Sequence, residues 1–60
     1  MKARVLKKLL AKNGWTFVRQ GGSHETWEHP EHGRQQFAAH NDGTEFGKAL
    51  MGKITKNFKL

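Results

Sequence analysis

The chain has 60 residues, so we expect a single domain over residues 1–60 that is too small to enclose a deep substrate cavity. It has no cysteine and no apolar run longer than three residues, which excludes a disulfide framework, a zinc site with cysteine ligands, a membrane span and a secretion signal, and which fits a cytoplasmic protein. Eleven lysines and arginines against five acidic residues give a net charge of +6, and this excess favours a polyanionic partner, most often nucleic acid.

The first predicted element is an amphipathic helix over residues 2–13. Its apolar stripe consists of Val5, Leu6, Leu9 and Leu10. Basic residues cluster on the opposite side, at Arg4, Lys7, Lys8 and Lys12. The pair Asn13-Gly14 supplies the stop signal, because glycine tolerates the left-handed conformation in which helices commonly end.

Three short strands are predicted next, at residues 15–19, 23–29 and 34–39. The first two contain β-branched and aromatic residues in alternation with polar ones, and the third shows the pattern more weakly. Turn signals separate them, at Gln20-Gly21-Gly22 and at residues 29–33, where both proline and glycine occur. Strands this short with tight connections predict an antiparallel meander.

The last predicted element is a helix that follows a loop at residues 40–43. Its apolar residues recur every four positions, at Phe46, Leu50, Ile54 and Phe58, with Met51 on the same stripe. Thr44 is the candidate N-cap, and Glu45 is favourable in a first helical turn. Gly47 and Gly52 each cost about 1 kcal/mol in a helix interior, so a later start at Gly47 is the alternative.

The order α-β-β-β-α predicts an α+β domain of two layers, in which two helices cover one face of a three-stranded antiparallel sheet. The large aromatic residues expected in its core are Trp15, Phe17, Trp27 and Phe37. The other sheet face has no cover, and period-two alternation decides which side chains occupy it. If Trp27 points into the core, then His24, Thr26 and Glu28 have the opposite parity and are predicted on the open face.

Short motifs stand in a fixed order along nearly the whole chain. They are Lys12-Asn13-Gly14-Trp15, Val18-Arg19-Gln20, Gly22-Ser23-His24, an aromatic residue at Trp27, His29-Pro30 and His40. This ordered set, in a chain of this length, resembles the HicA toxin family, also described as YcfA-like. The chain departs from the family pattern at Glu25, because the family often has a second histidine directly after the first.

The resemblance implies the toxin component of a type II toxin–antitoxin system, with a fold like that of a double-stranded-RNA-binding domain. It implies a metal-independent endoribonuclease that cleaves messenger RNA and uses no cofactor. The implied partners are RNA and a HicB-like antitoxin, with the toxin monomeric when alone and part of a larger complex with the antitoxin. The active-site histidine of the family maps onto His24.

RNA carries its own nucleophile, so cleavage requires a base that removes the proton of a 2′-hydroxyl and an acid that protonates the leaving 5′-oxygen. The ordinary pKa of histidine, about 6.5, lies close to cellular pH and suits both steps. We therefore expect His24 to be the general acid–base group, although no second proton-transfer group is evident. Contacts with RNA are expected from Gly22, Ser23, Lys7, Lys8, Arg19, Lys48 and Lys53.

Other functions remain open at this point. A non-catalytic RNA-binding module of the same fold shares the charge and shape, and differs in having no cleavage for His24 to perform. An interaction protein would use its basic surface only for an acidic partner and would bind RNA weakly. A metal site formed by histidines is disfavoured, because no carboxylate–histidine arrangement of a catalytic type surrounds them. The histidines in question are His24, His29, His32 and His40.

Overall fold

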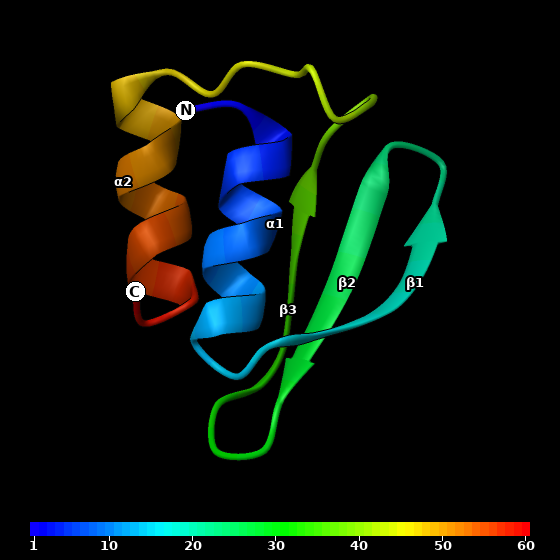
Figure 1. Cartoon of the computed structure of the whole chain (residues 1–60), viewed down its shortest axis with the longest axis vertical. Helices are drawn as coiled ribbons and strands as arrows, with labels where there is room; N and C mark the ends of the chain where they lie inside the picture. Colours follow the sequence, from blue (N-terminus) through cyan, green and yellow to red (C-terminus); the bar gives the residue numbers. More distant parts are fainter.

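Two helices and three strands make up the computed structural model, which describes all 60 residues. The elements are α1 (Ala3–Lys12), β1 (Thr16–Gly21), β2 (His24–His29), β3 (Gly33–Ala38) and α2 (Lys48–Asn57). The strands form one antiparallel sheet in the order β1-β2-β3, and the two helices lie side by side against the same face of it (Figure 1). The predicted two-layer α+β architecture is therefore confirmed.

Helix α1 buries a narrower stripe than the sequence predicts. Its buried residues are Ala3, Leu6 and Leu10. These recur at intervals of three and four residues, so they line one side of the helix, while Val5 lies on its flank and is 48% exposed. The prediction that Val5 belongs to the buried stripe is wrong. The predicted stop is confirmed, because Gly14 adopts a φ of 92° directly after the C-cap residue Asn13.

A β-bulge interrupts the pairing of β1 with β2. Phe17 pairs with Trp27 and Arg19 pairs with Thr26, so Val18 is an extra residue on β1. Beyond the bulge the strand continues two residues past its predicted end. Strands β2 and β3 pair residue by residue without a shift in register, within one residue of their predicted bounds.

The core lies between the sheet and the two helices. It contains ten buried apolar residues, namely Ala3, Leu6, Leu10, Trp15, Trp27, Phe37, Ala39, Phe46, Ile54 and Phe58. Phe58 joins both layers, because its ring lies 4.6 Å from that of Trp15 and 5.9 Å from that of Phe37, between centroids. The indole N–H of Trp15 also donates a hydrogen bond of 3.1 Å to the Phe58 carbonyl. The last residues of the chain thus close the core.

Two residues predicted for the core lie at its margin instead. Phe17 is 47% exposed, because β1 is the strand farthest from the helices (Figure 1), and its ring meets only the edge of Trp27 at 5.6 Å between centroids. Leu50 is 46% exposed, and Ile54 is the buried residue of α2. Neither side chain belongs to the buried core.

Helix α2 begins at Lys48 with Gly47 as its N-cap, so the predicted cap at Thr44 is wrong and the alternative start at Gly47 is within one residue of the observed one. The Oγ1 atom of Thr44 accepts hydrogen bonds from the backbone N–H groups of His40 and Asn41, both at 3.1 Å. These bonds fold the loop after β3 back on itself, which is a common use of threonine hydroxyls in turns.

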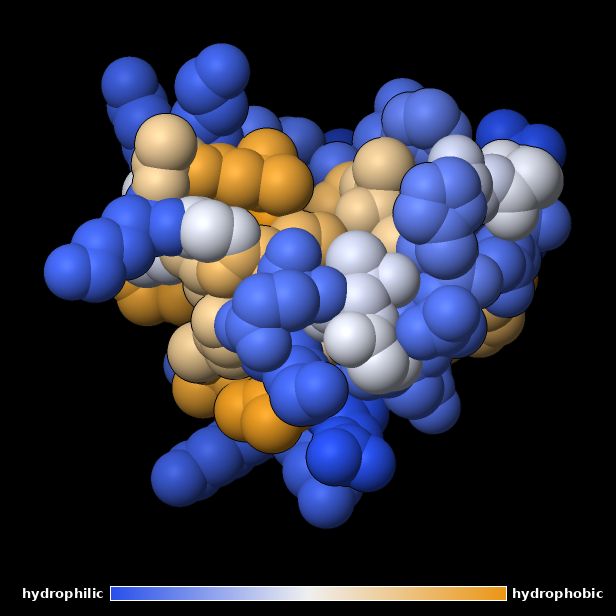
Figure 2. Space-filling view, turned by 90° about the horizontal axis from the view of Figure 1, so that it is seen from above, coloured by the Kyte–Doolittle hydropathy of each residue, from blue (hydrophilic) through white to orange (hydrophobic).

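The two layers present different surfaces. Seen from the end that carries the N-terminus, exposed apolar atoms gather on the side of the helices, whereas the side of the sheet is hydrophilic (Figure 2). The exposed apolar residues of the helical side are Met1, Val5 and Leu50. Both helices have ten residues, and neither has the length and apolar character needed to cross a membrane.

Candidate active site

The uncovered face of the sheet carries the candidate histidine. Glu25 and Trp27 are buried beneath the helices, and His24 is exposed on the opposite face, as alternation along β2 predicts. The tight turn before it contains Gly22, which adopts a φ of 61° that residues other than glycine rarely adopt. His24 therefore stands at the very start of a strand, directly after a sharp turn.

Open space flanks the His24 side chain across the sheet. Its two cross-strand neighbours are Gly21 on β1 and Ala38 on β3, which have the two smallest side chains. A Cβ atom added at Gly21 would meet no other atom within 4 Å. A large substrate can therefore reach the imidazole from the open face without displacing any side chain of the two neighbouring strands.

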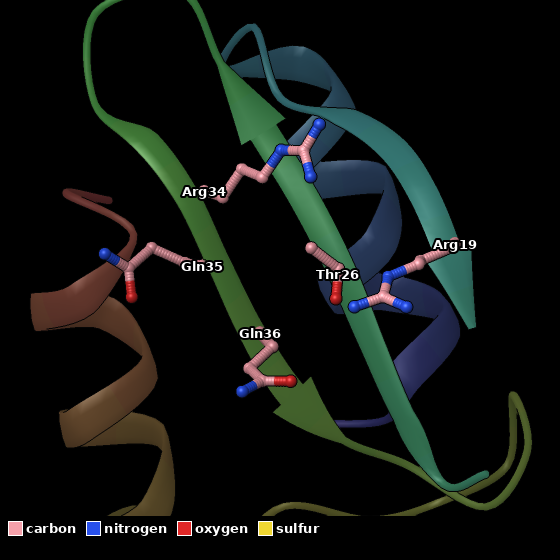
Figure 3. A pocket seen from close by; sticks show the side chains of 5 residues that line it. All are labelled: Arg19, Thr26, Arg34, Gln35 and Gln36. Carbon is pink, nitrogen blue, oxygen red and sulfur yellow. The ribbon is translucent and has the colours of Figure 1, made fainter. Parts of the chain in front are cut away.

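A polar depression of about 280 Å³ follows His24 along the same face of the sheet. It is lined by Arg19, Thr26, Arg34, Gln35 and Gln36 and contains no apolar side chain. Figure 3 shows the two guanidinium groups on either side of Thr26, on the face of the sheet away from α1. The Nε–H group of Arg34 donates a hydrogen bond of 2.9 Å to Glu28, whereas no carboxylate pairs with Arg19. This depression concentrates positive charge beside the histidine.

Arg34, Gln36 and Thr26 are not among the contact residues that the sequence predicts. Alternation had placed Thr26 on the open face, and the same rule applied to β3 would have found the other two. The depression itself depends on the register between strands, which the amino-acid sequence does not display. Gly22 and Ser23 lie in the turn next to this face, where the backbone carbonyl of Ser23 accepts a hydrogen bond of 2.6 Å from Ala39.

Lys7, which the sequence suggests as an RNA contact, is engaged within the protein. Its ammonium lies 2.6 Å from a carboxylate oxygen of Asp42 and 2.8 Å from one of Glu25. Hydrogen bonds to Asp42 and then to Glu25 raise the pKa of Lys7 above its ordinary value. Glu25, which directly follows the candidate histidine, is 2% exposed and also accepts a hydrogen bond from the Trp27 indole.

The other predicted lysine contacts lie on the helical layer. Lys8 is exposed on α1, and Lys48 and Lys53 are exposed on α2. Because both helices pack against the covered face of the sheet, these lysines do not share a surface with His24. Of the predicted side-chain contacts, the structure brings only Arg19 to the open face beside His24, and Ser23 lies in the turn that precedes the histidine.

The remaining histidines occupy different environments. His29, at the far end of β2, accepts a hydrogen bond at Nδ1 from the Glu31 N–H group, and its Nε2 atom lies 3.1 Å from the Asn13 carbonyl. Through these two contacts the His29 ring links the turn after α1 to the turn after β2. His40 follows β3 at the end of the sheet where His24 lies. No group of three or more histidine, aspartate or glutamate residues is arranged to hold a metal ion.

A model of the family described as HicA toxin of bacterial toxin–antitoxin matches residues 3–60, which is nearly the whole chain. No curated protein and no solved structure matches the chain.

Proposed function

The chain belongs to the HicA toxin family of bacterial toxin–antitoxin systems, and on that premise we propose that it is an endoribonuclease that cleaves messenger RNA without a metal ion. The observation that carries the proposal is the setting of His24, exposed on an uncovered polar face with glycine and alanine as its cross-strand neighbours. Such a face admits a long flexible substrate, which a 60-residue chain without a deep cavity requires.

The proposed reaction uses the nucleophile that RNA itself provides. The His24 imidazole accepts the proton of a ribose 2′-hydroxyl, whose oxygen then attacks the adjacent phosphorus. The bond from phosphorus to the 5′-oxygen breaks, and that oxygen takes a proton from the imidazolium or from solvent. Arg19, two residues along the open face, supplies positive charge that attracts the backbone of the substrate strand beside the reacting phosphate. The products of this scheme are a 2′,3′-cyclic phosphate and a 5′-hydroxyl.

The partner in this proposal is a HicB-like antitoxin that restrains the toxin until it is released. The toxin is proposed to be a monomer when alone, to form a larger complex with the antitoxin, and to act in the cytoplasm on messenger RNA. The net charge of +6 suits both partners, because it attracts the phosphates of RNA and an acidic protein surface alike. Lysines on the helical layer, such as Lys8, Lys48 and Lys53, add to this long-range attraction.

A second candidate function is a non-catalytic RNA-binding module. It is favoured by one observation, namely that the open face offers no evident partner for the second proton transfer. The one carboxylate on that face belongs to Glu28, which lies four residues from His24 along β2 and forms an ion pair with Arg34. His40 follows β3 at the same end of the sheet as His24, so it is the other histidine at that end.

Cleavage assays with matched histidine variants separate the two functions. Wild type, His24→Ala and His32→Ala are incubated with single-stranded RNA in excess chelator, and circular dichroism verifies that each protein is folded. His32 is an exposed histidine at the far end of the sheet, so its variant controls for the loss of a surface imidazole. We expect cleavage by wild type and His32→Ala and none by His24→Ala. Binding without cleavage by all three proteins would establish the second candidate instead.

A further inference from the structure

The bulge in β1 determines which face of the sheet Arg19 occupies. Phe17 faces the helical layer, because it pairs with the buried Trp27. Without an extra residue, strict alternation would turn Arg19 to that layer as well. Val18 shifts the register, so Arg19 pairs with Thr26 and its side chain stands on the open face. Bulges commonly redirect a side chain next to a functional site.

The redirected arginine completes a row of polar side chains beside the histidine. Arg19, Thr26 and Gln36 are direct cross-strand partners, as are Gly21, His24 and Ala38 in the neighbouring row. The two rows are separated by two residues of β2, a step of roughly 6.6 Å. That step is close to the spacing of successive phosphates in an extended nucleic-acid strand. A phosphate at His24 therefore brings the next phosphate to Arg19.

We propose that single-stranded RNA crosses the open face of the sheet along β2, and that Arg19, Thr26 and Gln36 bind the phosphate next to the one at His24. The guanidinium group of Arg19 has no carboxylate partner and can direct two N–H groups at one phosphate. The Thr26 hydroxyl and the Gln36 amide add uncharged donors. The identity of the ligand as RNA rests on the proposed function, whereas the site itself rests on the sheet.

The arrangement fits a single strand better than a duplex or an acidic protein. A strand that runs along β2 passes from the row of His24 to the row of Arg19 in a single line. An A-form duplex instead presents its phosphates in two lines, one on each side of a groove. An acidic protein would find its complement in the lysines of the helices as readily as in this face. Only an extended polyanion with a regular spacing of charges uses both rows together.

Binding assays in the absence of cleavage test the site. His24→Ala protein is titrated with a short fluorescein-labelled single-stranded oligoribonucleotide of mixed sequence, and anisotropy is recorded over a range of salt concentrations. Arg19→Ala in this background is expected to weaken binding about tenfold and to reduce the salt slope by about 0.7, the share of one phosphate contact. Lys12→Ala removes the same charge from an exposed position on α1 and is expected to have a much smaller effect.

Equal losses in the Arg19→Ala and Lys12→Ala proteins would overturn the proposal, as would tighter binding of a duplex than of the single strand. Amide chemical shifts of the His24→Ala protein give a second readout that needs no further variant. The oligonucleotide is expected to perturb β1, β2 and β3, and perturbations confined to the helices would contradict the site. The proposed ribonuclease function can fail while the binding site holds. This is the case if the wild-type protein binds RNA through Arg19 and does not cleave it.

Discussion

At the scale of single residues, Glu25 shows how a charge is kept inside this small core. Its carboxylate bonds the Lys7 ammonium at 2.8 Å and the Trp27 indole N–H at 3.2 Å, so both of its oxygens have partners. No buried side-chain nitrogen or oxygen in the chain lacks a hydrogen-bond partner. A buried carboxylate with these partners ties α1 to the central strand, and it occupies a position on β2 that faces away from the open face of the sheet.

We predict that Glu25→Ala lowers the free energy of unfolding by about 2–3 kcal/mol, because it leaves the Trp27 indole N–H buried without an acceptor and breaks the link to Lys7. Urea denaturation followed by tryptophan fluorescence measures the change. Glu28→Ala is the matched control, since it removes an exposed carboxylate whose pair with Arg34 contributes less than about 1 kcal/mol. Similar losses in the two variants would show that burial of Glu25 does not matter.

The surface carboxylates make the stability depend on acid pH. A hydrogen bond from Lys7 lowers the pKa of Asp42, and one from the N-terminal ammonium lowers that of Glu45. Such groups bind fewer protons in the folded state, so they stabilise the fold above their unfolded pKa values, and this contribution disappears as the pH falls through their folded-state values. We predict that the urea midpoint falls between neutral pH and about pH 3, and that Asp42→Asn shows a smaller fall. An unchanged pH profile in Asp42→Asn would contradict the role of the Lys7 pair.

At the scale of elements, patterns of spacing predicted the secondary structure and misplaced some of its margins. Helix α1 and strands β2 and β3 lie within one residue of their predicted bounds, since glycine turns and alternation are local signals. Thr44 has the chemistry of an N-cap, yet the loop uses its hydroxyl for another turn. The exposure of Phe17 depends on its strand being outermost, which is a property of the assembled sheet.

The bulge illustrates why the candidate site could be predicted only in part. Alternation along β2 placed His24 correctly, because that strand is regular and Trp27 marks its buried side. The face of Arg19 depends on an extra residue in β1, and nothing in the letters around Val18 distinguishes a bulged residue from a paired one. The charge of this surface therefore becomes visible only once the register is known.

Two single-residue deletions test the bulge. Deleting Val18 and deleting Arg19 both remove it and shorten β1 equally, but they leave different residues opposite Thr26. We predict that the protein without Val18 binds single-stranded RNA nearly as well as its parent, whereas the protein without Arg19 binds about tenfold more weakly. Anisotropy in the His24→Ala background measures both. Equal affinities would show that the residue opposite Thr26 does not contact RNA.

At the scale of the whole molecule, the two layers of the domain have different roles. The helices and the covered sheet face supply the core, and the open face is left free for a polar site. A domain of this size keeps only a few kcal/mol of net stability, roughly 3–9 kcal/mol at typical values per residue. Each core contact therefore contributes a large share of the net stability. Exposed side chains on the open face contribute little to it.

This division predicts opposite outcomes for changes in the core and on the open face, and Phe58 is the sharpest case. Its side chain is 1% exposed and lies among Trp15 and Phe37 at the point where the chain closes on itself. Phe58→Ala is expected to lower the free energy of unfolding by about 3–5 kcal/mol, which is comparable to the total stability. The protein should therefore lose cooperative unfolding, cleavage and RNA binding together.

Leu50→Ala is the control. It truncates a half-exposed apolar residue near the start of α2 and should lower the free energy of unfolding by less than about 1 kcal/mol. Thermal unfolding by circular dichroism compares both with His24→Ala, which should lose cleavage and retain the transition of wild type. A cooperative transition near that of wild type in Phe58→Ala would mean that the end of the chain does not hold the two layers together.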